Sequence, residues 1–494
     1  MKFGKLLQRN YGTNQIKSFD QIPGPKSLPI IGTLWQYLPG IGMYSFDRIH
    51  HNGMKKFQKY GPVVREEFVP GVNTVWLIKP TDYQEMFKVE GKYPMRRSHL
   101  ALEKFRMDRK HIYNSAGLLP TNGPEWYRLR SAIQKKISRV QNIKKYISST
   151  NDVVNEFCQH IVELNTNRIV QNCYLPEFSR LSLELTCLVV FDERLNGFTK
   201  TELKENSTSS KLLQAAFDTN SSILGTDNGP QLWKYFDTPL YKTIKHAQLF
   251  MESIAVKLVT KKLENLQQED KDDHSILEQL LKSEQLDYKD VIGFACDMLL
   301  AGIDTMSYTL CFVFYHLAKN PNAQEKLYKE ILELLPNKQT EVTAEIIENA
   351  KYTKSVLKES LRLNPVSIGI GRILNEDAIF SNYHVPKGTV VVTQNQITCR
   401  LEEYFQNPNE FLPERWLRNM KDYKSVHPYL LLPFGHGPRS CIARRLAEQN
   451  MLIVILKIIR SFKVTWNDKR NLDTKSVLIN KPDGKINLLF HSRK

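Results

Sequence analysis

The sequence predicts a mainly α-helical chain with a small β lobe. Between about residues 125 and 318 the apolar residues recur mostly with a helical period. Two short runs rich in β-branched and aromatic residues, 63–69 and 74–78, come before that region and predict a hairpin, because Pro70-Gly71 separates them. No repeat and no Pro/Gly-rich linker divides the middle of the chain, so we expect one domain over residues 21–494.

A basic stretch of 20 residues comes before that domain. It contains four basic residues and no acidic one before Asp20, and its longest apolar run is Leu6-Leu7. That run cannot span a bilayer, and it is too short for the apolar middle of a secretory signal. A basic leader without acidic residues is typical of a mitochondrial transit segment, and a frayed basic tail is the alternative. The stiff segment Ile22-Pro23-Gly24-Pro25 marks the expected start of the fold.

Charge and cysteine content narrow the classes of partner. The chain has 69 Lys and Arg against 52 Asp and Glu, a formal charge of +17, which favours an acidic partner or an anionic membrane. We expect no nucleic-acid partner, because the chain has no zinc-finger spacing, basic-aromatic RNA signature or long basic tract. The seven cysteines are scattered, odd in number and without a C-x-x-C pair, which argues against a disulfide framework and suits a reducing compartment.

The longest apolar segment covers residues 291–318 and ends at Asn320-Pro321. Its length would suit a membrane span. Because Asp297 and Asp304 lie inside it, we expect instead a buried core helix with functional polar residues. The polar stretches 204–210 and 268–274 are predicted loops.

The most specific feature is the loop of residues 433–445, Pro-Phe-Gly-His-Gly-Pro-Arg-Ser-Cys-Ile-Ala-Arg-Arg. Gly435 and Gly437 permit turns that are closed to residues with a Cβ, so the chain can approach a flat group and leave amides free to donate to the thiolate of Cys441. A helix expected over 442–462 would place the positive end of its dipole behind that sulfur. Such a thiolate is a strong electron donor to haem iron, whereas the alternative is a buried, inert cysteine.

This loop resembles the cytochrome P-450 signature F-x-x-G-x-R-x-C-x-G at Phe434, Gly437, Arg439 and Cys441. Only Ala443 departs from it, where the family usually has glycine, and alanine is small enough to keep close packing on the haem. The resemblance implies the P-450 fold, an α-rich triangular prism around a buried haem b. It also implies that Cys441 is the axial ligand of the iron.

A second match concerns a structural ion triad. The E-x-x-R motif at Glu359 and Arg362 places both side chains on one helical face. Residues 411–416, Phe-Leu-Pro-Glu-Arg-Trp, resemble the family segment whose arginine joins that pair. By this resemblance Glu359, Arg362 and Arg415 form a triad with a role in folding and none in catalysis.

A third match concerns the haem propionates. The motif W-x-x-x-R at Trp126 and Arg130 holds a propionate in the family, and Arg372 and Arg439 occupy positions of further propionate contacts. With Phe434 they complete the expected cofactor-binding set. Arginine suits this role because its planar donors engage a carboxylate as a fork. Without the motif, an arginine at any of these positions would more often be an ordinary surface charge than a propionate ligand.

Residues 301–305, Ala-Gly-Ile-Asp-Thr, match the family motif A/G-G-x-D/E-T. The small residues leave space beside the iron, and Asp304 and Thr305 are the expected catalytic pair, which organises waters that deliver protons to dioxygen. Thr305 could also bond back to a carbonyl one turn earlier. Met306 replaces the usual second hydroxyl residue and predicts a more apolar pocket. A haem-thiolate isomerase or dehydratase is the rival function, but such enzymes typically lose the acid–threonine pair.

Lys354 and Lys358 lie on the same predicted helix as the E-x-x-R motif. A solvated basic face is one reading. In the mitochondrial class, lysines at these positions receive an acidic ferredoxin, which an NADPH-dependent reductase supplies with electrons, and Arg444-Arg445 also resembles that class. We therefore expect a mitochondrial enzyme bound peripherally to the matrix side of the inner membrane, with its basic surface steering the ferredoxin.

The substrate is expected to be lipophilic, because the predicted pocket is apolar. Its expected lining residues are Leu118, Leu119, Ala301, Met306, Val366 and Ile370. Segments 92–99, 117–124 and 441–450 resemble the arthropod ecdysteroid 22-hydroxylases. That resemblance implies an ecdysteroid precursor hydroxylated at carbon 22, while another mitochondrial steroid hydroxylase or a xenobiotic oxidase stays open.

Overall fold

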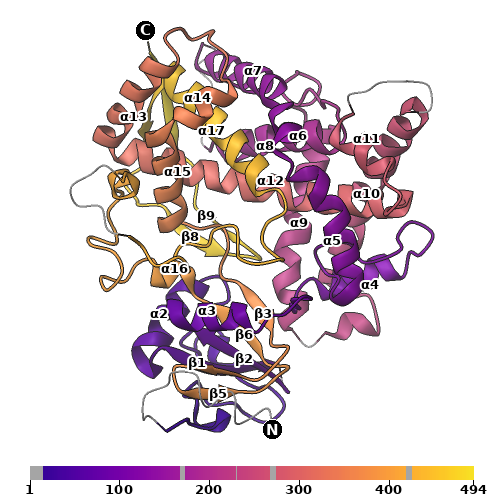
Figure 1. The fold of residues 1–494 in the computed structure, drawn as a ribbon, viewed down its shortest axis with the longest axis vertical. Coiled ribbons are helices and arrows are strands. Elements are labelled where there is room, and N and C mark those ends of the chain that lie inside the picture. The colour runs from indigo at the N-terminus through magenta and orange to yellow at the C-terminus, as the bar shows by residue number, and fades with distance from the viewer. Residues whose placement is uncertain are drawn as a thin grey trace.

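The computed structural model describes residues 15–69, 71–166, 173–229, 231–266, 274–418 and 425–493. A large helical lobe is stacked on a smaller β lobe (Figure 1). The predicted class, mainly α with a small β lobe, is confirmed.

The β lobe is built on a four-stranded sheet with the order β1-β2-β6-β3. β1 (Val63–Val69) and β2 (Val72–Leu77) pair antiparallel, which confirms the predicted hairpin. β6 (Val390–Thr393) pairs parallel with β2 and antiparallel with β3 (Gly371–Ile373), so segments far apart in the chain share one sheet. The β-branched and aliphatic side chains that predict these strands supply its buried face.

The other described strands form three two-stranded sheets: β4 (Ala378–Phe380) with β5 (Tyr383–Val385), β7 (Phe462–Trp466) with β10 (Leu488–Ser492), and β8 (Asp473–Ser476) with β9 (Asn480–Asp483). The helices of the β lobe are α2 (Ile49–Tyr60), α3 (Pro80–Lys88) and α16 (Asn395–Thr398) (Figure 1). Four short 3-10 helices are η1 (Phe19–Gln21), η2 (Leu34–Tyr37), η3 (Leu232–Lys234) and η4 (Pro413–Trp416).

The remaining helices are α4 (Leu100–Met107), α5 (Gly123–Ile137), α6 (Val140–Lys144), α7 (Ile147–Thr166), α8 (Leu175–Val190), α9 (Thr208–Asn228), α10 (Pro239–Leu266), α11 (Ile276–Leu281), α12 (Tyr288–Lys319), α13 (Pro321–Leu334), α14 (Ala344–Asn349), α15 (Lys351–Leu363) and α17 (Arg444–Ser461). They surround α12, which crosses the middle of the molecule (Figure 1).

The central helix α12 is the predicted core helix. It begins earlier than predicted because Asp287 and Asp290 form a capping box, each side chain accepting a hydrogen bond from the other's backbone N–H. It ends before Pro321, which begins α13. Within the described residues α12 alone is long and apolar enough to cross a membrane, but 83% of its apolar window is buried inside the protein. Asp297 is accommodated there because Arg106 donates to it at 2.7 Å.

Two other predicted boundaries were also wrong. The predicted loop 204–210 ends earlier, because the hydroxyl of Ser207 accepts a hydrogen bond from the backbone N–H of Ser210 and starts α9 at Thr208. The helix predicted over 442–462 is α17, which begins only at Arg444 because Ile442 and Ala443 belong to the preceding turn. The predicted loop 268–274 lies outside the described residues except for its last residue.

The basic N-terminal stretch is described only from residue 15, so residues 1–14 of the predicted leader lie outside the described part of the chain. Residues 15–20 lie on the β lobe. The backbone N–H of Lys17 donates to Asn382 at 2.8 Å, and that of His384 donates to Lys17 at 2.9 Å. Asp20 pairs with Arg65 at 2.8 Å. This part of the stretch is therefore hydrogen-bonded to the domain.

Candidate functional site

The cysteine loop folds back on itself just before α17. Gly435 and Gly437 have φ values of 76° and 73°, the left-handed conformations that the sequence predicts. The backbone N–H of Cys441 donates to the carbonyl of Phe434 at 2.7 Å, which closes the loop. A Cβ at position 437 would lie 2.0 Å from an oxygen of Glu90, so this glycine is also required by close packing.

Cys441 is the exposed residue among the seven cysteines, all of which lie in the described part of the chain. Desolvation by the surrounding protein raises the pKa of its thiol, while the backbone N–H of Ala443 and the charge of Arg130 act in the opposite direction. That N–H belongs to the turn that begins α17, so the positive end of this helix lies beside the sulfur. A bound metal cation would favour the thiolate further.

Four arginines gather around the loop: Arg96, Arg130, Arg372 and Arg439. Burial and the charges of the other three lower the pKa of Arg439 to about 8. Burial lowers that of Arg130 to about 10. Within the described residues only Arg372 in this cluster pairs with a carboxylate, that of Glu90 at 2.7 Å.

The polar contacts of this cluster leave its charge unbalanced. Arg439 donates to the carbonyl of Thr121 at 2.6 Å and to the side chain of Asn122, while its buried Nε has no hydrogen-bond partner. Arg130 donates to Gln134 at 2.8 Å. Four cations, two of them buried and two partly buried, with only one carboxylate are costly unless an anion joins them. A haem with two propionates has the charge that the cluster requires.

Aromatic side chains accompany the cluster. The guanidinium of Arg439 lies 4.7 Å from the ring centroid of Trp126, which is 1% exposed. Trp126 and Arg130 lie one turn apart on α5, as their spacing predicts. The guanidinium of Arg444 lies 5.5 Å from the ring centroid of Phe434. The structure thus brings Trp126 and three of the predicted arginines together, and adds Arg96, which the motifs did not indicate.

One face of α12 also suits a flat ligand. Thr305 is exposed, and Ala301 and Gly302 are partly exposed, although the flanking residues of this central helix are buried. Residues four apart share a helix face, so this face borders accessible space inside the protein. The hydroxyl of Thr305 donates to the carbonyl of Ala301 at 2.6 Å, the local bond that a helical threonine commonly makes.

Asp304 points away from that face and is buried at 4% exposure. Burial raises its pKa to about 6, while hydrogen bonds from Asn220 and Tyr308 partly counteract the increase. The amide of Asn220 on α9 donates to the carboxylate at 2.8 Å. A carboxyl group with this pKa can hold or release a proton near neutral pH. Sequence reasoning missed Asn220, because one polar residue on a helix carries no motif.

The predicted ion triad is assembled at the end of α15. Glu359 accepts from Arg362 at 2.8 and 2.9 Å and from Arg415 at 2.9 Å. It also accepts from the indole N–H of Trp416 at 2.9 Å and from the backbone N–H of Leu412 at 3.0 Å. Both Glu359 and Arg362 are fully buried. Trp416 is a member of the cluster that the motif did not reveal.

The six predicted pocket residues fall into two groups. Leu118 and Leu119 are tied to α12, since their backbone N–H groups donate to Asp297 at 2.6 and 3.4 Å, and Ala301 and Met306 lie on α12 itself. Val366 and Ile370 follow α15 and are nearly buried. Among the described residues no hydrogen bond joins this second group to α12.

The two predicted partner-binding lysines are exposed on α15. Lys354 donates to the carbonyl of Glu348 at 2.8 Å, and the Nζ of Lys358 lies 4.0 Å from the ring centroid of Trp416. Burial and the charges of Arg418 and Arg444 lower the pKa of Lys358. A positive patch is therefore formed by Lys358, Arg418 and Arg444. Arg444 is only three residues from Cys441 in the chain.

Known proteins resemble this chain over nearly its whole length. The family model described as Cytochrome P450 matches residues 22–490. The chain is 46% identical over 487 residues to "Cytochrome P450 302a1, mitochondrial" of Drosophila melanogaster, with 98% of each chain covered. It is 32% identical to "Probable cytochrome P450 12a5, mitochondrial", covering 96% of this chain and 91% of the relative, and 29% identical to "Ecdysone 20-monooxygenase", covering 94% and 87%, both of the same organism.

Proposed function

Because the chain belongs to the cytochrome P450 family of haem-thiolate monooxygenases, we propose that it is a mitochondrial enzyme that hydroxylates an ecdysteroid precursor at carbon 22. The observation that carries the site is the group of buried and partly buried arginines beside Cys441, which lacks the negative charge that a haem would supply. Two relatives named as mitochondrial support the compartment. A relative named for its action on ecdysone supports the substrate class.

The cofactor is proposed to be haem b, bound between the cysteine loop and the exposed face of α12. Cys441 would bind the iron, and Trp126, Arg130, Arg372 and Arg439 would hold the propionates. When bound, the haem supplies the redox chemistry that activates dioxygen. The left-handed glycines of the loop allow the backbone to approach this flat group closely.

We assign proton delivery to Asp304 and Thr305. Asp304 can carry a proton at neutral pH because burial raises its pKa to about 6. Asn220 holds the carboxylate in place from α9. Thr305 presents its hydroxyl on the exposed face, and its bond to Ala301 fixes the rotamer while its lone pairs stay free for a water molecule.

The electron donor is proposed to be an acidic ferredoxin with an NADPH-dependent reductase. Lys358 lies near Arg418 and Arg444, and Lys354 lies one turn before it on α15. A positive patch there would steer an acidic protein toward the haem and shorten the path for electrons.

The first test concerns the ligand to the iron. The full chain, loaded with haem, is reduced under carbon monoxide, and the Soret band is compared between wild type, Cys441→Ser and Cys158→Ser. We expect the red-shifted band of thiolate ligation in wild type and Cys158→Ser, and its loss in Cys441→Ser. The same band in folded Cys441→Ser protein would contradict the assignment.

The second test concerns the reaction. The holoenzyme is incubated with 22-deoxyecdysone, an ecdysteroid that lacks the hydroxyl at carbon 22, together with ferredoxin, its reductase and NADPH. Mass spectrometry and NMR should find one added oxygen atom at carbon 22. Turnover that needs no external electrons would instead indicate an isomerase, and hydroxylation of unrelated drugs but no steroid would indicate a xenobiotic oxidase.

A further inference from the structure

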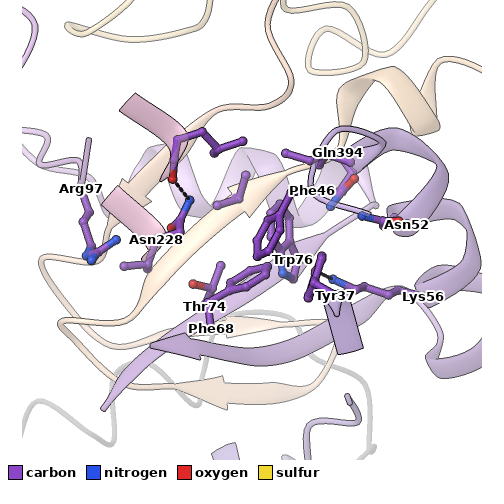
Figure 2. A pocket seen from close by; sticks show the side chains of 15 residues that line it. Tyr37, Phe46, Asn52, Lys56, Phe68, Thr74, Trp76, Arg97, Asn228 and Gln394 are labelled. Atoms are coloured by element: carbon purple, nitrogen blue, oxygen red, sulfur yellow. Dashed lines mark hydrogen bonds between the residues drawn. The ribbon is translucent and has the colours of Figure 1, made fainter. Parts of the chain in front are cut away.

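A cavity of about 160 Å³ lies in the β lobe between the sheet, α2 and the C-terminal end of α9 (Figure 2). None of the residues predicted for the haem site line it. Phe46, Phe68 and Trp76 form its aromatic wall, and Leu224 and Val392 add aliphatic surface. Flat aromatic walls of this kind suit a lipophilic ring.

One part of the wall is an internally satisfied polar network. Lys56 and Glu66 are buried and hydrogen-bonded to each other. Glu66 also accepts from the hydroxyl of Tyr37 at 2.9 Å and from the indole N–H of Trp76 at 3.0 Å. The Nζ of Lys56 lies 4.8 to 5.4 Å from the centroids of four aromatic rings. This network holds the aromatic wall in place and offers no free donor to a ligand.

Other polar groups of the lining have unused hydrogen-bonding capacity. Gln394 is 6% exposed, and its side-chain amide makes no hydrogen bond within the described residues. Arg97 uses only Nη2, which donates to the carbonyl of Asp227 at 2.8 Å. Figure 2 shows Arg97 and Asn228 on one side of the cavity and Gln394 on the other. These groups border the cavity and can therefore form hydrogen bonds with the polar atoms of a ligand there.

We propose that this cavity is a second binding site, which takes the ring end of a lipophilic molecule with a hydroxyl or carbonyl oxygen. The amide of Gln394 can both donate to and accept from a hydroxyl, and Arg97 can donate to an oxygen. The volume of about 160 Å³ is close to that of a cavity that holds benzene, roughly 150 Å³, so one ring fits. This inference rests on the proposed function, from which the occupant is a steroid.

The cavity is joined to the candidate haem site by the segment that follows Tyr93. Arg97 lines the cavity, and its neighbour Arg96 belongs to the arginine cluster and donates to the carbonyl of Leu119 at 3.0 Å. The same segment is tied to the end of α9, since the N–H groups of His99 and Leu100 donate to Asp227 at 2.7 and 2.9 Å. A ligand in the cavity therefore contacts a segment that also borders the haem site.

The test measures how many steroid molecules the haem-loaded full chain binds. Equilibrium dialysis with tritiated 22-deoxyecdysone should give two molecules per haem, while the haem spectrum reports the active site alone. Leu224→Trp fills the cavity and should reduce the count to one. Leu249→Trp, a matched change at an exposed position of α10, should keep two. Gln394→Leu should weaken the second site by about tenfold through loss of its hydrogen bonds.

The outcomes separate this inference from the proposed function. A shift of the haem spectrum with one molecule per haem in wild type would overturn the second site and leave the substrate assignment standing. An unchanged haem spectrum with one bound molecule that Leu224→Trp removes would support the cavity and refute the substrate. A count of two that Leu224→Trp does not reduce would also overturn the inference, because the second molecule would lie elsewhere.

Discussion

Replacing Glu359 by glutamine should destabilise the protein strongly. The carboxylate accepts five hydrogen bonds, two from Arg362 and one each from Arg415, Trp416 and Leu412, and it is fully buried. A glutamine of the same shape would turn N–H groups toward donors that now bond to an oxygen. It would also leave two guanidinium groups without a counter-charge.

The expected cost is about 3–5 kcal/mol, the usual effect of removing one partner from a buried ion pair. Glu414→Gln on η4 is the matched control. Its carboxylate pairs with Lys326 at 2.7 Å but is 23% exposed, and Lys326 is 59% exposed. Exposed pairs contribute about 0–1 kcal/mol. The two substitutions have the same chemistry, but Glu414 is less buried and accepts fewer hydrogen bonds, those from Lys326 and from the hydroxyl of Tyr352 at 2.9 Å.

Urea unfolding of the haem-loaded chain, followed by far-UV circular dichroism, gives the measurement. A chain of this length need not unfold in two states, so midpoints are compared rather than extrapolated free energies. With a slope of about 3 kcal/mol/M or more, Glu359→Gln should lower the midpoint by about 1 M. A decrease no larger than that of Glu414→Gln would refute the reasoning.

The pH dependence supplies a second check. Burial by itself raises the pKa of Glu359, but the hydrogen bonds and charges of Arg362 and Arg415 outweigh it and hold this pKa below its ordinary value. A carboxyl whose pKa is lowered by folding stabilises the protein above its unfolded pKa, near 4.3. The difference between wild type and variant should thus be constant from pH 8 to about pH 5 and shrink as the pH falls further.

Three other perturbations test the site. Asp304→Asn should lower steroid hydroxylation roughly a hundredfold with little change in substrate Kd. Because burial raises the pKa of Asp304 to about 6, the charged carboxylate destabilises the wild-type protein. The variant should therefore resist urea better than wild type, fully above pH 6 and not at all below about pH 4. Equal turnover would contradict its role. Gly437→Ala should accelerate haem loss on heating more than Gly435→Ala. Both glycines have left-handed backbones, but only at position 437 does a carboxylate oxygen lie 2.0 Å from the new Cβ. Equal rates of haem loss would disprove the packing argument. Lys358→Glu should raise KM for an acidic ferredoxin about tenfold at low salt, an effect that salt removes, whereas Lys211→Glu on α9 should leave KM unchanged; no change in either variant would refute the docking patch.

The sequence predicted the features that depend on neighbours close in the chain. The hairpin of β1 and β2, the core helix α12 and the one-face placement of Glu359 and Arg362 each follow from local spacing, and the structure has all three. The start of α9 was predicted wrongly, although Ser207 is a residue type that caps helices and marks it.

The features that the sequence did not predict depend on partners brought together by the fold. Asn220 meets Asp304 across 84 positions, and Arg106 meets Asp297 across 191. No periodicity indicates which polar residue on a helix will face another helix. Arg96 lies in the segment 92–99, yet its membership of the arginine cluster depends on the packing of that segment near the cysteine loop.

The contact between the N-terminal stretch and β5 affects how far the chain can be shortened at this end. A cut that leaves residue 15 onward keeps the two backbone bonds of Lys17 and the ion pair of Asp20 with Arg65. A cut after residue 20 would remove them and expose the backbone of β5 as a free sheet edge, a surface prone to pairing with other chains. Recombinant enzyme that begins near residue 15 should therefore stay monodisperse, whereas shorter versions should aggregate.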